Sequence, residues 1–304
     1  MKNVCVLGSI NMDVVLGVNK IPRLGETVLS NGVKKNPGGK GANQAVAAAR
    51  LGANVFMIGK VGRDSNGDHL VKKLKADGIN TDYVGIEADK PTGTAIIAVD
   101  CEGNNSIIVD PGSNMSIDEN EIDAAESIIK SSDIIVAQFE TPIAATLRAF
   151  KIAKENNVFT LLNPAPVSHV PDELFKFTDL IVPNETEAEA LTGIAVKDMD
   201  SAKRAAAEFQ RYGVEYVVIT LGSRGAAIIS KDKAEIIDAY KVKAVDTTAA
   251  GDAFIGACAS RLCKYKCLKY EYVKDAVVFG NKVSSIAVQR HGAQPSLPFI
   301  DEVI

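Results

Sequence analysis

The chain has 304 residues, of which 46% are hydrophobic and 24% charged, enough for one large α/β domain or two smaller ones. Its net charge is −4 and it contains no basic block, which argues against nucleic acid or an anionic membrane as a partner. No stretch reaches the roughly 18 apolar residues of a membrane span, and the N-terminus lacks the features of a signal peptide. We therefore expect a cytoplasmic protein.

The metal-binding residue types show no strong pattern. Five cysteines, an odd number without paired C-x-x-C spacing, predict reduced thiols. Cys263 and Cys267 are one helical turn apart, which alone is weak support for a metal site. The three histidines are too scattered for a zinc or catalytic cluster.

Short apolar runs along the chain predict buried parallel strands. Helical patterns lie between several of them, and one has an apolar face at 202–209 with Gly213 as its C-terminal stop. Alternating β and α elements predict an α/β fold, with a mostly parallel central sheet covered by helices on both faces. The expected strands are 4–7, 55–58, 134–137, 159–162, 180–182 and 216–221.

Two regions, 14–35 and 92–109, break this alternation, because they resemble strands joined by turns and carry few helix signals. Asn104 and Asn105, between two strand-like runs, predict a hairpin in the second region. Two β pieces that leave an α/β body and return predict a small sheet over its open edge, that is, a lid. No repeat, linker or low-complexity stretch divides the chain, so we expect residues 1–304 to form a single domain that includes this lid.

A glycine-rich segment, Pro37-Gly-Gly-Lys-Gly-Ala-Asn-Gln44, runs into a helical pattern and would place Lys40 and Asn43 in the first helical turn. Lys40 is followed by Gly41 rather than Ser or Thr, so this is not a Walker A loop, and the G-x-G-x-x-G pattern is absent too. A Gly-Gly turn with Lys and Asn suits a small polyhydroxylated ligand that the backbone approaches. A loop that only packs tightly against a neighbour is the alternative.

Several predicted strands end in a polar or glycine-rich loop. In open parallel sheets, ligands bind outside the carboxyl ends of the strands. One such loop is ordinary turn chemistry, but five at the same edge predict a binding site. The five loops are 8–13, 138–140, 163–166, 183–187 and 222–225.

The segment Asp246-Thr-Thr-Ala-Ala-Gly-Asp252 precedes a helix of small residues. The first N–H groups of a helix lack internal partners and, with the helix dipole, attract an anion such as phosphate. Small residues at 249–251 let that anion approach, and Asp252 beside it can accept a proton from an attacking hydroxyl, which predicts phosphoryl transfer. On this heptapeptide alone, an ordinary helix capped by Asp246 or Thr248 fits equally well.

Six segments together resemble the signatures of the ribokinase-like (PfkB) carbohydrate kinase family. They span Gly8 to Ser296, nearly the whole chain. The resemblance is closer to the ribose-phosphorylating branch than to the fructokinase, adenosine kinase or 6-phosphofructokinase branches. Many members have Gly where this chain has Ala249, but Ala is common in that branch. The segments are 8–13, 38–43, 184–187, 220–225, 246–252 and 292–296.

The resemblance implies a lid that closes over a sugar, and ATP-dependent phosphorylation of D-ribose at O5 to give D-ribose 5-phosphate and ADP. The absence of an extra Arg/Lys cluster favours a free sugar over a sugar phosphate. One alternative is a related kinase acting on 2-deoxyribose, fructose, adenosine or another sugar or nucleoside. Another is a non-catalytic sensor on the same scaffold, against which the retained Asp252 and its anion turn argue.

Individual roles follow from the same resemblance, although some of these residues have simpler explanations. Asp13 could be a solvated turn residue, Glu140 an exposed loop acid, and Asn184 with Glu187 a capping box. The implied catalytic residues are Ala249, Ala250, Gly251 and Asp252. The implied sugar ligands are Asn11, Asp13, Gly39, Lys40, Asn43, Glu140 and Asp252. The implied ATP-binding residues are Asn184, Glu187, Thr220, Gly222, Gly225 and Asn281, the last near adenine, where His is more familiar.

The resemblance further implies two cations and a second copy of the chain. Glu187 would act on Mg²⁺ through water, and no all-protein magnesium cage is expected. Two loops would hold K⁺ behind the anion turn, although two ordinary loops joined by a hydrogen bond would look the same in sequence. A homodimer would form through the lid sheets. The implied K⁺ ligands are Asp246, Thr248, Ala287, Arg290, Gly292 and Ser296.

Overall fold

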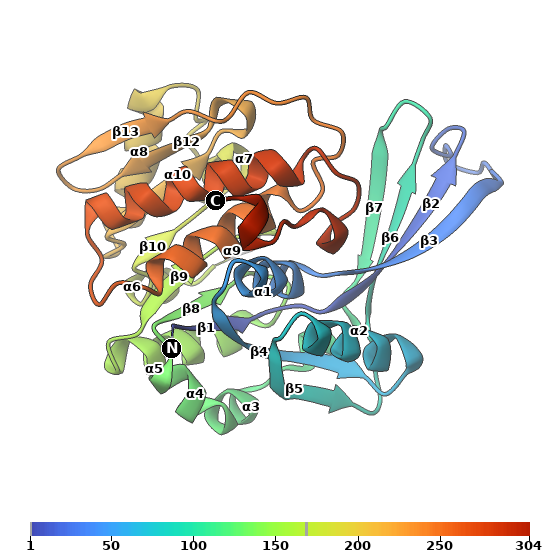
Figure 1. Ribbon diagram of the computed structural model, residues 1–304, viewed down its shortest axis with the longest axis horizontal. Coiled ribbons are helices and arrows are strands. Elements are labelled where there is room, and N and C mark those ends of the chain that lie inside the picture. Colours follow the sequence, from blue (N-terminus) through green and yellow to red (C-terminus); the bar gives the residue numbers. More distant parts are fainter. Residues whose placement is uncertain (1, 168–169) are drawn as a thin grey trace.

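The computed structural model describes residues 2–167 and 170–304, and within them a nine-stranded sheet forms the centre of the molecule (Figure 1). Its strands are β1 (Asn3–Leu7), β4 (Asn54–Gly62), β5 (Asn80–Glu87), β8 (Ile134–Ala137), β9 (Phe159–Leu162), β10 (Leu180–Ile181), β11 (Tyr216–Thr220), β12 (Ala226–Ile229) and β13 (Ala234–Ile237). The order is β13-β12-β11-β10-β9-β8-β1-β4-β5, parallel from β11 to β5, with β12 and β13 added antiparallel. The predicted, mostly parallel sheet is confirmed.

Helices cover both faces of this sheet, as predicted (Figure 1). Side chains of a strand point alternately to opposite faces, so Val4 and Val6 belong to one buried cluster and Cys5 and Leu7 to the other. The first cluster includes α1 (Lys40–Arg50), α2 (Ser65–Ala76), α9 (Ala250–Leu262) and α10 (Tyr270–Ala287). The second includes α3 (Glu119–Ala124), α4 (Glu126–Ser131), α5 (Ile143–Glu155), α6 (Asp172–Lys176), α7 (Glu185–Thr192) and α8 (Met199–Gln210).

The strand order reverses beside β1. From there β4 and β5 extend the sheet on one side, and β8 to β11 extend it on the other. In open α/β sheets, the crevice at such a reversal, outside the carboxyl ends of the strands, is where ligands bind. The polar residues that follow β1 and β8 are therefore held at the expected site.

The lid is a separate sheet that projects from the body (Figure 1). It contains β2 (Asn11–Val18), β3 (Ser30–Gly38), β6 (Gly93–Val99) and β7 (Asn105–Asp110), in the order β3-β2-β6-β7. β6 and β7 form the predicted hairpin, and β2 pairs with β6 in parallel. β2 begins, and β3 ends, closer to the body than the predicted boundaries of 14–35. Asn11, Asp13 and the glycine turn therefore lie where the lid joins the body.

Helices α1 and α9 pack closely against each other. Gly256 permits this contact, because a Cβ there would lie only 2.5 Å from the Ala47 Cβ and 2.6 Å from the Gln44 carbonyl oxygen. The N-terminal turns of the two helices are consequently adjacent. The two glycine-containing sequence motifs, far apart in the chain, meet there.

Cys263 and Cys267 do not share a helix, so the sequence interpretation of one helical turn between them is wrong. α9 ends at Leu262, the buried Cys263 donates to the Ser260 carbonyl, and Cys267 is exposed in the following loop. In the described ranges, no three His, Cys, Asp or Glu side chains are grouped as metal ligands. No helix in those ranges has the length and apolar character needed to cross a bilayer.

Candidate active site

The N-terminus of α9 begins from a left-handed residue. Ala249 is the N-cap, with φ 58° and ψ 13°. Glycine adopts this left-handed conformation without strain, but alanine does not. The Ala250 N–H donates to the Thr247 carbonyl at 3.2 Å. Helix geometry offers no internal partner to the next two N–H groups, those of Gly251 and Asp252. The N–H groups without internal partners are therefore those of 251–252, one residue later than the turn predicted at 249–251.

Gly251 keeps space for a ligand. A Cβ at this position would have no protein atom within 4 Å, so packing does not require glycine there. The same residue borders a cleft of about 470 Å³. A side chain at 251 would extend into this cleft.

Asp252 is buried, and both of its carboxylate oxygens accept hydrogen bonds from α1. Asn43 Nδ2 donates to Oδ2 at 2.9 Å, and Gln44 Nε2 donates to Oδ1 at 3.0 Å. Two neutral amide donors hold the carboxylate in place without pairing it with a positive charge. Such a group remains available as a proton acceptor.

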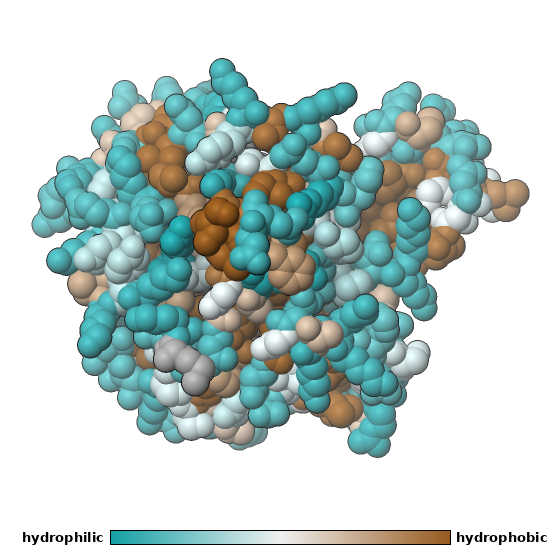
Figure 2. All heavy atoms as spheres, viewed as in Figure 1, coloured by the Kyte–Doolittle hydropathy of each residue, from teal (hydrophilic) through white to brown (hydrophobic). Residues whose placement is uncertain are grey.

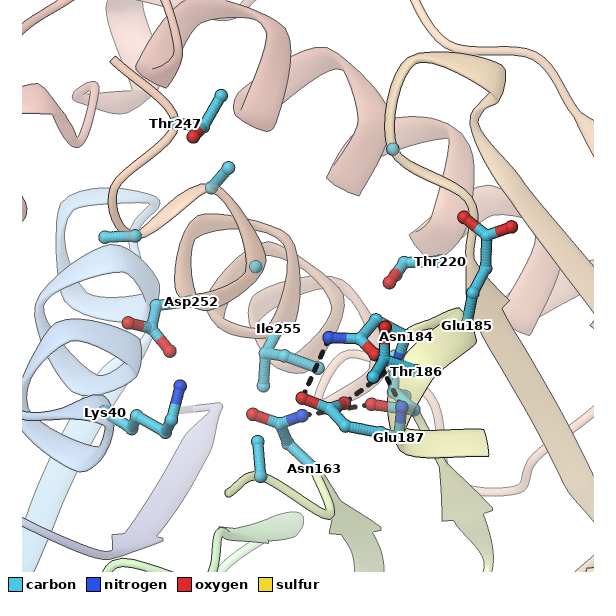
Figure 3. A pocket seen from close by; sticks show the side chains of 16 residues that line it. Lys40, Asn163, Asn184, Glu185, Thr186, Glu187, Thr220, Thr247, Asp252 and Ile255 are labelled. Carbon is cyan, nitrogen blue, oxygen red and sulfur yellow. Dashed lines mark hydrogen bonds between the residues drawn. The ribbon is translucent and has the colours of Figure 1, made fainter. Parts of the chain in front are cut away.

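Lys40 carries a positive charge close to three acids, Asp252, Glu140 and Glu187. Figure 3 shows its amine between Asp252 and Glu187. Burial alone would lower the pKa of its amine, but the carboxylates of Asp252, Glu140 and Glu187 outweigh burial and raise that pKa. Lys40 therefore stays protonated at neutral pH. Its amine points into the cleft beside Asp252, where an incoming phosphate would be attracted.

Glu140 caps the N-terminus of α1. Its Oε2 accepts from the Lys40 N–H at 3.1 Å and from the Ser9 hydroxyl, and the Ser9 carbonyl accepts from the Ala42 N–H at 2.9 Å. The turn into α1 requires glycine at position 39, where φ is 91° and a Cβ would crowd the Ser9 backbone. Glu140 is thus a fixed residue of the site and not an exposed loop acid.

Asp13 lies on β2 and is partly buried, so it is not a solvated turn residue. Burial raises its pKa, and the nearby charges of Glu140 and Asp252 raise it further, to about 7. A Cβ on Gly38 would overlap the Asp13 carboxylate, so glycine is needed on the neighbouring strand. The carboxylate oxygens of Asp13 can therefore accept hydrogen bonds from the hydroxyls of a ligand.

Ionised Asp13 is expected to destabilise the folded protein, because the folded-state pKa of about 7 exceeds the ordinary value of 3.8. Between these two values the unfolded chain has released a proton that the folded chain keeps, so stability falls as pH rises. The Asp13→Asn variant should exceed the wild type in unfolding free energy by roughly 4 kcal/mol at pH 8, and by only about 0.5 kcal/mol at pH 4. Thermal unfolding at pH 4, 6 and 8 measures this, and a difference that does not change with pH would contradict it.

Asn11 is oriented by a residue from the end of the lid. Asn114, in the 3₁₀ turn Gly112–Ser116, donates from Nδ2 to Asn11 Oδ1 at 2.7 Å. Its own Oδ1 accepts from the Ile10 N–H at 2.9 Å. Because the oxygen of Asn11 is engaged, its NH₂ group is the one that can face a ligand.

The cleft of about 470 Å³ opens between the strand ends and the N-terminus of α9 (Figure 3). Asn184 and Glu187 form the predicted capping box at the start of α7, with 2.8 Å bonds in both directions, and both also line the cleft. Burial raises the pKa of Glu187, although the Asn184 N–H and the Lys40 charge oppose the change. The capping and ligand-binding interpretations are therefore compatible.

A second cleft, of about 450 Å³, adjoins the first one, and Thr220 and Gly222 line both. Val242 and Phe254 give it an apolar part that suits a planar ring. Asn281 lines it as well, but its Nδ2 donates to the carbonyls of Ile237 (3.0 Å) and Asp238 (3.2 Å). Its amide donor thus holds the end of β13 instead of pointing freely at a bound base.

At Gly225, φ is 95° and a Cβ would overlap the Ile237 carbonyl oxygen. The turn from β11 into β12 therefore requires glycine here. This turn places Thr220 and Gly222 at the border of the two clefts.

The two loops predicted to hold K⁺ lie side by side. Asp246 Oδ1 accepts from the Thr248 N–H at 2.9 Å, and Oδ2 accepts from the Gly292 N–H at 2.8 Å. Burial favours the neutral acid, but these bonds outweigh it and hold the pKa of Asp246 below its ordinary value. Neither Asp246 nor Thr248 caps α9, since its N-cap, Ala249, has no side-chain cap. The alternative of an ordinary helix capped by Asp246 or Thr248 is therefore wrong.

Two other expected K⁺ ligands have internal partners. The Ala287 carbonyl accepts from the Arg290 N–H at 3.0 Å, and the buried Ser296 hydroxyl donates to the Ala293 carbonyl at 2.7 Å. Both oxygens still have a free lone pair, so the donor set of carboxylate, carbonyls and hydroxyl remains one that suits a hard cation.

The structure thus gathers the residues predicted from sequence into three adjoining groups. The first group lies near Asp252 and contains Asp13, Lys40, Asn43 and Glu140. The residues predicted to bind ATP line the two clefts, and the two loops predicted to hold K⁺ meet beside the N-terminus of α9. Sequence reasoning assigned no role to four side chains that hold this site together. They are Ser9, Gln44, Asn114 and Gln138. For Gln44, a polar residue within an alanine-rich helix was an available signal.

Comparison with known proteins agrees with this arrangement. Residues 1–300 match the model of the pfkB family of carbohydrate kinases. The chain is 46% identical over 301 residues to a ribokinase of Staphylococcus aureus, covering 99% of this chain and 98% of that protein. It is 36% identical over 310 residues to a deoxyribokinase of Salmonella typhi, with 99% and 97% covered.

Among solved structures, that of Arabidopsis thaliana ribokinase complexed with ribose and ATP is similar, with a TM-score of 0.91 and 31% identity. The match covers 99% of this chain and 96% of that one. The fold, the gathered residues and a family match over nearly the entire length lead to one conclusion: this chain belongs to the pfkB family of carbohydrate kinases.

Proposed function

We propose that this protein is a ribokinase, which transfers the γ-phosphoryl group of ATP to O5 of D-ribose and releases ADP. The observation that carries the proposal is the position of Asp252. It lies between the acids and amides at the base of the lid and the cleft at the N-terminus of α9. A ribokinase that shares 46% of its residues with this chain supports the choice of sugar, as does a solved ribokinase described with ribose and ATP.

In the proposed reaction, Asp252 accepts the proton of the attacking sugar hydroxyl as the new O–P bond forms and the bond to ADP breaks. Asn11, Asp13 and Asn43 bind the other hydroxyls. The N–H groups of Gly251 and Asp252, together with Lys40, stabilise the charge on the transferring phosphoryl group.

A magnesium ion fits the residues at the cleft. Glu187 and Asn184 offer oxygen groups beside the space for the triphosphate, and magnesium usually keeps several waters rather than requiring an all-protein cage. Bound there, the ion would neutralise charge on the phosphates.

An ADP-release assay with ribose, 2-deoxyribose, fructose and adenosine tests the assignment. We expect the highest kcat/KM with ribose. A deoxyribokinase that is 36% identical makes 2-deoxyribose the second candidate, and a preference for it, or for fructose or adenosine, would replace ribose in the proposal. No turnover with any of them would favour a non-catalytic sensor.

Potassium is the second part of the proposal. An ion held between the Asp246 loop and the 287–296 tail would fix the turn that precedes α9 without touching sugar or ATP. We expect K⁺ to raise kcat several-fold over Na⁺ or tetramethylammonium at matched ionic strength, and Asp246→Ala to remove the difference. Equal rates in all three salts, with contaminating potassium excluded, would show that these loops hold no activating ion.

A homodimer through the lid sheets is the third part. β7 is an edge strand, and Ile107 and Ile108 on it are 55% and 69% exposed, so the lid presents apolar side chains to solvent (Figure 2). Because the two side chains point to opposite faces of the lid, a second copy packed on the face that carries Ile108 would bury that one. Ile108→Glu should convert the dimer to a monomer in analytical ultracentrifugation. Ile236→Glu, at an exposed isoleucine on β13 of the body, should not.

We also propose that residues 1–304 act as one kinase domain, because the lid strands carry part of the sugar site. The proposed location is the cytoplasm, in keeping with five cysteines that are all unpaired.

A further inference from the structure

A chain of buried amide side chains leads from the central sheet to Asp252. Gln138, directly after β8, donates from Nε2 to Oε1 of Gln44 at 2.6 Å. Gln44, on α1, donates from Nε2 to Asp252 Oδ1 at 3.0 Å and to Asn163 Oδ1 at 3.1 Å. Gln138 and Gln44 are 0% and 1% exposed, so water does not compete for these bonds.

One backbone carbonyl determines which amide donates and which accepts in each of these hydrogen bonds. The Val182 carbonyl can only accept, and Asn163 Nδ2 donates to it at 3.1 Å, so Asn163 presents its oxygen to Gln44. Gln44 must then direct its NH₂ group at Asn163 and Asp252, which leaves its oxygen for Gln138. The amide of Gln44 thus has one orientation in which all of its groups are paired.

Two glycines make room for this arrangement. A Cβ on Gly8 would overlap Gln138 Oε1, and a Cβ on Gly41 would lie 2.6 Å from the Gly8 backbone. With glycine at both positions, α1 lies directly against the end of β1. Gln44 can then reach Gln138 and Asp252 at once.

The two oxygens of Asp252 differ in the partners that hold them. Oδ1 is held by Gln44, whose orientation is fully determined. Oδ2 is held by Asn43, whose own Oδ1 is buried and has no hydrogen-bond partner in the described part of the chain. An unpaired buried amide oxygen is costly, and a hydroxyl of a bound ligand would satisfy it. Of the two amides that donate to Asp252, Asn43 is therefore the one that can exchange partners when a ligand binds.

We propose that Gln44 is a positioning residue for the catalytic base, oriented by Gln138 and Asn163, and that the two oxygens of Asp252 have separate tasks. Oδ1 stays bonded to Gln44, and Oδ2 receives the proton of the attacking hydroxyl once Asn43 has turned to the sugar. The O–H bond of the acceptor breaks as its O–P bond forms, and the departing ADP keeps the electron pair of the broken P–O bond. The inference rests on the proposed kinase function and assigns this task to Gln44 and Gln138, which line neither cleft, and to Asn163 at the edge of the first cleft.

Replacing Gln44 with Met removes the amide at nearly constant volume. A carboxylate without its anchor can rotate out of line with the hydroxyl, so kcat should fall about 10- to 100-fold. The KM values for ribose and ATP should stay within about twofold, because no ligand contact is lost. A role in packing alone would lower stability and leave kcat per folded molecule unchanged.

Gln138→Met tests the next link and keeps the proposal testable if Gln44→Met does not fold. It should lower kcat by about threefold, since Gln44 keeps two of its three bonds. In the Gln44→Met background, the same change should have no further effect on kcat. If the two losses multiply in the double variant, Gln138 does not act through Gln44.

Thr160→Val is the matched control. Thr160 is buried on β9, and its hydroxyl donates to the Phe177 carbonyl at 2.7 Å and accepts from the Asp179 N–H at 2.8 Å. The variant therefore loses hydrogen bonds that lie away from Asp252. It should lower the melting temperature and leave kcat unchanged. All rates are measured with the best acceptor of the ADP-release panel, alongside Asp252→Asn.

The outcomes separate the two ideas. Full activity of Asp252→Asn would contradict the proposed function. An inactive Asp252→Asn, together with a Gln44→Met variant at wild-type kcat or with a loss confined to KM, would overturn only the positioning proposal.

Discussion

Replacing Asp252 with Asn should lower kcat by roughly 10²- to 10⁴-fold, while the affinity for ribose changes much less. The substitution keeps the size of the side chain and removes its charge and its basicity. Because the carboxylate accepts from Asn43 and Gln44, an amide in its place also turns an NH₂ group towards one of these two donors. Steady-state kinetics with ribose and ATP, together with ribose binding by calorimetry, measure the two effects separately.

Asp198→Asn is a suitable control for this experiment. Asp198 caps α8 through the Ser201 N–H at 2.8 Å and lies outside the proposed machinery. That variant should lose some stability and keep its kcat. An Asp252→Asn enzyme that retains a third of the wild-type kcat would show that Asp252 is not the base.

The second large effect is expected at the sugar. At pH 8, above the Asp13 pKa of about 7, Asp13→Ala should lower kcat/KM for ribose by roughly one to two orders of magnitude, since a lost hydrogen bond to a charged acceptor is worth about 1.5–3 kcal/mol. Asp13 is adjacent to the charges of Glu140 and Asp252 but lines neither of the two clefts proposed to bind ATP. The affinity for ATP without sugar should therefore barely change.

Measurements of ribose binding alone and of ATP binding alone show to which ligand site Asp13 belongs. A collapse of ATP binding with ribose binding intact would reverse the assignment of the two ligand sites. The pH series on Asp13→Asn is independent of this test, because it measures folding and not activity.

Much of the fold follows from local pattern. Short runs such as Ile134–Ala137 are apolar throughout because both faces of a parallel sheet are covered, and that signal is visible in one sequence. The lid was also predictable, since two β regions interrupt the α/β alternation. β2 begins before, and β3 ends after, the predicted region of 14–35, because strand pairing, not local composition, extends these strands to Asn11 and Gly38.

The site was predictable only in part. Glycine turns and a carboxylate at a helix start carry their own chemical signal, so Lys40, Asn43 and Asp252 could be named from sequence. Gln138 and Asn114 could not be assigned roles in the same way. Each lies about 100 residues from the side chain that it orients, Gln44 at a separation of 94 and Asn11 at a separation of 103.

The sequence by itself determined the alternation of strands and helices, the lid and the chemical character of the loops at the strand ends. These depend on periodicity, turn residues and side-chain type, all of which are local. The tertiary structure alone decided that Asp246 and Thr248 do not cap α9, that Asp13 is held as an acid with a raised pKa, and which amides hold Asp252. Such features depend on desolvation and on bonds between distant segments. Neither exists until glycines such as Gly8 and Gly256 let α1 pack against β1 and α9.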